Sequence, residues 1–124
     1  MYLKSKIALT YNAGITGQAT TTVLGRVKSF MRDGDCTQLG ANFLYANNDA
    51  EGEDKPVILQ GAFELKTPEE IQAVYDMIKD DLPSTDDEPL YERTKIYYAF
   101  RLEMYKTFLP LNPDLQLTDI EVLD

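Results

Sequence analysis

The sequence predicts an α+β fold in which an antiparallel β-meander of three or four strands packs against one or two helices. Two patterns support this prediction. Apolar and polar residues alternate through residues 20–32 and through two later segments, which is typical of half-buried strands. From residue 67 onward, apolar residues recur every three or four positions, as in an amphipathic helix. The chain has 124 residues, and we expect a single domain over residues 1–124.

The N-terminal part, residues 1–17, is expected to form a strand or an extended arm. Apolar side chains are frequent as far as Tyr11, and Asn12, Gly14 and Gly17 then interrupt the pattern.

The β-meander is expected over residues 18–66. In its first strand the alternation assigns four residues to each face: Thr21, Val23, Val27 and Met31 on one, and Thr22, Arg26, Lys28 and Arg32 on the other. Asp33 and Gly34 are a strong signal for a hairpin turn. Two further strands follow, with Phe43 and Phe63 among their alternating apolar residues.

The connection at residues 47–56 is long, since a hairpin loop usually has about two to five residues. We expect it to protrude and to contact a partner. Its acidic residues follow the spacing of the first half of a calcium-binding loop. The twelfth position, however, is Ile58 and not a bidentate glutamate, so the loop is not an EF-hand. A weak divalent-ion site stays open, and no metal ligand is assigned.

A helix is predicted over residues 67–82. Thr67 can cap it, Glu70 can complete a capping box with Thr67, and Pro83 ends it. Its apolar stripe is expected to cover one face of the sheet. The residues expected to meet there are Ile71, Val74, Tyr75 and Ile78 on the helix, and Val23, Val27, Phe43, Tyr45, Leu59 and Phe63 on the strands.

The segment 89–109 fits either a second helix or a strand, because its apolar residues satisfy both periods. Its length favours a helix, as do Pro89 at a plausible first position and Asp87 or Glu88 ahead of it. Residues 110–124 are expected to form a C-terminal tail with a short strand within 115–122.

Composition excludes several classes of function. The formal net charge of −9 disfavours binding to a nucleic-acid backbone, although Arg26, Lys28 and Arg32 on one strand face leave a local anion contact open. No apolar run approaches the roughly 20 residues that span a bilayer, so we expect a soluble protein without a membrane partner. The single cysteine, Cys36, excludes an intrachain disulfide.

No catalytic constellation is recognisable in the sequence. The chain has no histidine, which is the most common general base and metal ligand near neutral pH. Cys36 follows Asp35, and a neighbouring carboxylate disfavours a thiolate nucleophile. The many carboxylates lie in expected loops and at helix ends. We therefore expect a protein that is not an enzyme and that has no cofactor.

The order of features across residues 20–109 resembles small structural proteins of tailed bacteriophages and prophages, from the tail or baseplate module. The segments that carry this resemblance are the Thr/Val-rich strand, Phe43-Leu44-Tyr45-Ala46, the loop end Glu53-Asp54-Lys55-Pro56, Val57-Ile58-Leu59-Gln60-Gly61-Ala62-Phe63, and the tyrosine-rich segment from Tyr97 to Pro110. The resemblance implies a virion component that is assembled in the host cytoplasm with other virion proteins. It also implies a homo-oligomer in that assembly. The predicted helix at 67–82 is longer than the stretch such proteins usually have there.

Contact residues for such an assembly are expected in the acidic loop, the N-terminal arm and the C-terminal tail. They are Tyr2, Tyr11, Asn47, Asn48, Asp49, Glu51, Glu53, Asp54, Leu115, Leu117 and Ile120. One alternative is a small acidic protein-binding or inhibitor module of the anti-defence type, which presents carboxylates to a basic partner. A second alternative is a ligand-binding or enzymatic domain, which would need a deep pocket with convergent polar groups.

Overall fold

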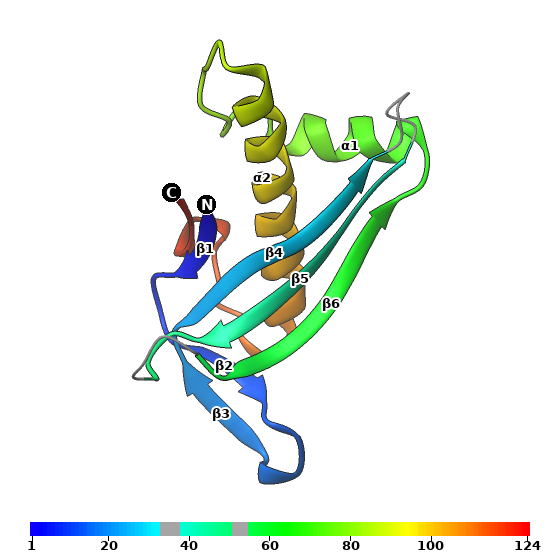
Figure 1. Ribbon diagram of the computed structural model, residues 1–124. Coiled ribbons are helices and arrows are strands. Elements are labelled where there is room, and N and C mark those ends of the chain that lie inside the picture. The colour runs from blue at the N-terminus through cyan, green and yellow to red at the C-terminus, as the bar shows by residue number, and fades with distance from the viewer. Residues whose placement is uncertain (33–37, 51–54) are drawn as a thin grey trace.

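The computed structural model describes residues 1–32, 38–50 and 55–124 (Figure 1). The strands are β1 (Tyr2–Ser5), β2 (Leu9–Asn12), β3 (Gln18–Thr21), β4 (Val23–Arg32), β5 (Leu39–Asn47), β6 (Val57–Leu65) and β7 (Ile120–Leu123). The helices are α1 (Pro68–Ile78) and α2 (Glu88–Phe108), with short 3-10 turns at Gly14–Thr16, Leu109–Leu111 and Leu117–Asp119. Mixed helices and antiparallel sheets confirm the α+β class. The predictions for Asp33, Gly34, Asp35 and Cys36 concern residues outside the described ranges.

The main sheet has the strand order β6-β5-β4-β1-β7, and all of its neighbouring strands are antiparallel. The expected meander is present as β4, β5 and β6. The N-terminal strand β1 lies inside the sheet, where Leu3 pairs with Gly25 of β4 and with Val122 of β7. The N-terminal segment therefore forms the strand alternative and not an extended arm at β1, and the short strand expected in the C-terminal tail lies at Ile120–Leu123. Figure 1 shows the two termini side by side at this end of the sheet.

The predicted strand at 20–32 is divided at Thr22 into β3 and β4. β3 pairs with β2 in a separate hairpin, which projects beyond the main sheet in Figure 1. Within β4 the register with β5 shifts between Val27 and Ser29, so Lys28 is the extra residue of a β-bulge. The bulge reverses the alternation beyond it. Phe30 then pairs with the buried Ala41, whereas Met31, expected on the core face, is 71% exposed.

The core lies between the sheet and α2, which confirms the helical alternative for this segment. The side chain of Asp87 caps α2 by accepting a hydrogen bond from the Leu90 N–H at 3.0 Å. The Phe100 ring lies 5.0 Å from the Phe43 ring and 5.6 Å from the Tyr45 ring, centroid to centroid. The remaining buried members of this cluster are Leu3, Leu9, Val23, Tyr97, Met104, Phe108, Leu115 and Ile120.

Gly25 lets α2 approach the sheet closely. A methyl group at this position would lie 3.1 Å from the edge of the Phe100 ring and 3.3 Å from Cβ of Leu3. Both distances are tight for carbon contacts, so a larger residue here would push the helix away from the strand.

The cap of α1 forms at the predicted residue: the Thr67 hydroxyl accepts a hydrogen bond from the Glu70 N–H at 3.2 Å. The Glu70 carboxylate accepts a hydrogen bond from the Lys66 N–H at 2.9 Å, whereas the predicted capping box would use the N–H of Thr67. The helix ends at Ile78, earlier than predicted.

The position of α1 differs from the prediction. It contacts α2 and the end of β6, and it does not cover the sheet centre, which α2 occupies. Figure 1 shows α1 at the far end of the long strands, beside the N-terminal half of α2.

Candidate functional site

β6, a strand of nine residues, forms one edge of the main sheet, and the four-residue β7 forms the other. The strand β6 pairs with β5 on one side and, in the described part of the chain, with no strand on the other. Its nine residues read Val-Ile-Leu-Gln-Gly-Ala-Phe-Glu-Leu, so Glu64 is the single charged residue within it. Val57 and Leu59 are exposed large apolar side chains. This combination gives an apolar strand edge whose outward backbone groups are open to solvent.

The helix layer leaves much of β6 uncovered because α2 packs on β7, β1 and β4. Leu59 pairs with the fully buried Tyr45 but is itself 44% exposed. Gly61 lies under the Phe43 ring, and a methyl group there would come within 2.9 Å of the ring carbon Cζ. The ring therefore fills the space that a side chain at Gly61 would need, and it holds the middle of the strand on the core.

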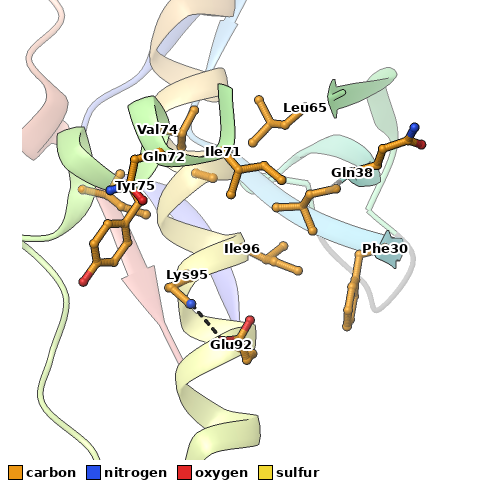
Figure 2. Close-up of a pocket in the computed structure, with 13 residues that line it drawn as sticks. Phe30, Gln38, Leu65, Ile71, Gln72, Val74, Tyr75, Glu92, Lys95 and Ile96 are labelled. Atoms are coloured by element: carbon orange, nitrogen blue, oxygen red, sulfur yellow. Dashed lines mark ion pairs between the residues drawn. The ribbon is translucent and has the colours of Figure 1, made fainter. Parts of the chain in front are cut away.

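A hollow of about 300 Å³ lies between the end of the sheet, α1 and the N-terminal half of α2. Figure 2 shows side chains from these three elements around it. Its apolar lining residues are Phe30, Leu39, Leu65, Ile71, Val74, Ile78, Ile96 and Ala99.

The charged groups of this hollow are bound to each other. The Lys95 ammonium lies 2.8 Å from the Glu92 carboxylate, the pair dashed in Figure 2, and 4.8 Å above the Tyr91 ring. The hydroxyls of Tyr75 and Tyr91 are 3.4 Å apart, and this contact raises the pKa of Tyr91. These polar groups satisfy one another, and the remaining lining is apolar except for Gln38 and Gln72. The hollow therefore suits an apolar side chain better than a reaction.

The first residues of the acidic loop are fixed against the junction of β3 and β4. The Asp49 carboxylate accepts hydrogen bonds from the Thr21 hydroxyl at 2.6 Å, the Thr22 N–H at 3.0 Å and the Thr22 hydroxyl. These bonds lower the pKa of Asp49 to about 2. Asn48 joins the same network through its N–H, which donates to the Thr22 carbonyl at 2.9 Å. The first half of the loop thus has a structural role, because its hydrogen bonds hold it against the β3–β4 junction.

On the other side of the loop, the Asn47 N–H donates to the Pro56 carbonyl at 2.9 Å, and Lys55 donates to the Asn48 carbonyl at 3.0 Å. The predicted contact residues Glu51, Glu53 and Asp54 lie outside the described residues.

The other predicted contact residues have different surroundings. Leu115 and Ile120 are 3% and 1% exposed, so their side chains belong to the core and are not available to a partner. Both are apolar residues near the chain end that the sequence assigned to a tail. Tyr2, Tyr11 and Leu117 are half-buried and keep some surface for a contact.

Sequence reasoning missed the tip of the β2–β3 hairpin. Ile15 at this tip is fully exposed, and Gly14 and Gly17 beside it have φ values of 73° and 88°. Positive φ favours glycine, and the two glycines with Asn12 were the signal for a turn. The exposed apolar tip is therefore a second candidate contact element in addition to the edge of β6.

Within the described ranges, no group of three or more Asp, Glu or Cys side chains is arranged to hold a metal ion. In the same ranges, neither helix combines the length and the apolar character needed to cross a bilayer. Comparison of the chain with family models, curated proteins and solved structures gives no match.

Proposed function

We propose that the protein is a structural, non-enzymatic subunit of a tailed-phage virion, from the tail or baseplate, and that copies of it assemble through the edge of β6. The observation that carries this proposal is the apolar, weakly charged and uncovered edge strand. Monomeric proteins usually protect such an edge with lysines, prolines or a covering segment, because it pairs readily with another chain. An edge without that protection is expected in a protein that uses it for assembly.

The sequence of β6 suits pairing with a second copy of itself. In an antiparallel arrangement centred on Gly61, Leu59 of one copy lies opposite Phe63 of the other, on the same sheet face as the core aromatic residues. Glu64 then lies opposite Ile58, so no carboxylates face each other. Cross-strand pairs of aromatic and aliphatic residues each stabilise a sheet by roughly 0.2–1 kcal/mol. The pairing would join two five-stranded sheets into one.

The placement in a phage particle rests on the order of features along the sequence. A Thr/Val-rich strand, an aromatic strand, a long loop, an apolar strand and a tyrosine-rich segment follow one another as in small tail and baseplate proteins. A virion subunit must also present several faces to different neighbours. The exposed hairpin tip at Ile15 and the free β6 edge would serve as two such faces.

The experiment that tests this proposal is sedimentation of intact particles from the phage or lysogen that encodes the chain. We expect the protein to sediment with the particles in a fixed ratio to the other virion proteins, at low and at high salt. Leu59→Lys should reduce its incorporation, because the charge would lie in the joined edge. The chain's absence from purified particles would refute the virion assignment. Loss from the particles at high salt alone would favour the acidic inhibitor alternative.

A further inference from the structure

One half of β4 has a free edge that is distinct from the edge of β6. The short strand β1 pairs only with Leu24 and Gly25 of β4. From Arg26 to the end of β4, the described residues pair on the β5 side alone. This free half of β4 runs past the N-terminal part of α2, and a groove of about 360 Å³ lies between the two elements.

The groove has an apolar floor. It is formed by Val27 and Phe30 from the strand and by Ile96 and Tyr97 from the helix. Phe30 is 51% exposed, so it offers apolar surface that the fold does not cover. Its side chain also reaches the neighbouring hollow under α1, which makes the apolar surface continuous beyond the groove.

The rim of the groove is positively charged. Lys28, at the β-bulge, and Arg93, on α2, both line it, and both are exposed. Arg26 adds a third exposed cation on the same free half of β4. None of the three belongs to an ion pair within the described ranges, whereas Lys95 and Arg101 on the same helix are paired. Unpaired cations gathered at one edge are notable in a chain of net charge −9.

We propose that the free half of β4 and the start of α2 bind an extended acidic segment of a partner protein as an added strand. The open backbone of β4 supplies hydrogen bonds to the partner's main chain. Lys28 and Arg93 pair with its carboxylates, and its apolar side chains contact Phe30 and Ile96. A nucleic acid fits less well, because the rest of the chain repels phosphates and a phosphate backbone cannot complete a sheet. This site does not depend on β6 pairing.

The test is fluorescence polarisation with a short labelled peptide in which valine and glutamate alternate, titrated with the full chain. We expect saturable binding that weakens as the salt concentration rises. Lys28→Glu and Arg93→Glu should each weaken binding on the order of fivefold. Lys106→Glu, the matched control at the other end of α2, should leave it unchanged. A peptide with lysine in place of glutamate should not bind.

Three results would overturn the proposal. The first is an absence of saturable binding at low salt. The second is binding that neither Lys28→Glu nor Arg93→Glu changes, and the third is stronger binding to a single-stranded oligonucleotide than to the peptide. Gln60→Glu separates this site from the β6 edge. It should leave peptide binding intact, whereas a loss equal to that of Arg93→Glu would place the peptide on β6 and contradict the groove assignment.

Discussion

Replacing Tyr45 with phenylalanine should stabilise the protein, which is the opposite of the usual effect of a core substitution. The Tyr45 side chain is fully buried, and its ring packs on those of Phe43, Phe100 and Phe108 at centroid distances of 5.1, 5.6 and 5.2 Å. Within the described residues, its hydroxyl has no hydrogen-bond partner. The neighbouring Thr107 hydroxyl donates to the Glu103 carbonyl at 2.8 Å.

The expected magnitude follows from this geometry. A buried polar group without a partner costs about 1–3 kcal/mol, and Tyr45→Phe removes that group while keeping the ring. We expect the free energy of unfolding to rise by about 1 kcal/mol, at the low end because the Thr107 hydroxyl lies nearby. For a chain of 124 residues this corresponds to an increase of about 4 °C in Tm.

The pH dependence gives a second readout. Burial raises the pKa of the Tyr45 phenol above its ordinary value of 10.0, so the folded state keeps the phenol neutral while the unfolded state ionises. Wild type therefore loses stability as the pH rises above 10. The phenylalanine variant has no phenol at this position, so it does not show this loss. The difference in unfolding free energy between the variant and wild type should grow by about 1 kcal/mol by about pH 11.

The assay is urea denaturation followed by far-UV circular dichroism at neutral and at high pH. Tyr91→Phe is the matched control at neutral pH, because the Tyr91 hydroxyl makes the long 3.4 Å contact with Tyr75 near the surface, and the variant should change stability little there. A loss of 1 kcal/mol or more in Tyr45→Phe at neutral pH would refute the reasoning. It would mean that the hydroxyl has a partner in solution.

Three further predictions concern stability. Asn112→Ala should lower the unfolding free energy by about 2–3 kcal/mol in urea titrations. The Asn112 side chain forms hydrogen bonds with the Thr10 N–H, the Thr10 carbonyl and the Phe108 carbonyl, at 2.9, 2.9 and 2.8 Å. An unchanged urea midpoint would contradict this link between β2 and α2. Gly25→Val should cost about 1–3 kcal/mol by crowding the ring that packs on the strand, and a melting temperature equal to wild type would argue against the close approach. Because the folded pKa of Asp49 is about 2, below its ordinary 3.8, its contribution is present above pH 3.8 and is lost as the pH falls toward 2. Asp49→Asn should therefore reduce the fall in Tm that wild type shows at acid pH. A fall equal to that of wild type would count against a structural role for the Asp49 hydrogen bonds.

The parts of the fold that depend on neighbouring residues were predictable. Thr67 was identified as a helix cap, and the cap of α2 was narrowed to Asp87 or Glu88, because a cap needs only the next three residues. The meander followed from alternation, since each strand must place its apolar face on the core.

The parts that depend on distant pairing were not predictable. The bulge at Lys28 is set by the register with β5, and a single extra residue exchanged the positions of Phe30 and Met31. The sequence also contains two helices with an apolar face, and no local sequence feature determines which of them covers the sheet. α2 does so because the chain path brings Phe100 over Gly25.

The candidate site was only partly visible in the sequence. The length of the acidic loop predicted a contact role, yet the Asp49 carboxylate accepts hydrogen bonds from Thr21 and Thr22 of the same chain. The β6 edge has an ordinary alternating sequence, and its exposure follows from being last in the strand order. Likewise, Leu115 and Ile120 could not be assigned to the core without the position of α2.

Sedimentation velocity over a concentration series tests the central claim, assembly through the edge of β6, most directly. We predict that the wild-type chain associates with itself at high and low salt, and that Leu59→Lys and Gln60→Lys are both monomeric with wild-type melting behaviour. Ser84→Lys, which adds the same charge in the exposed connection before α2, should associate as wild type does. A wild-type chain that stays monomeric at every concentration, or association that both β6 variants retain, would contradict the account.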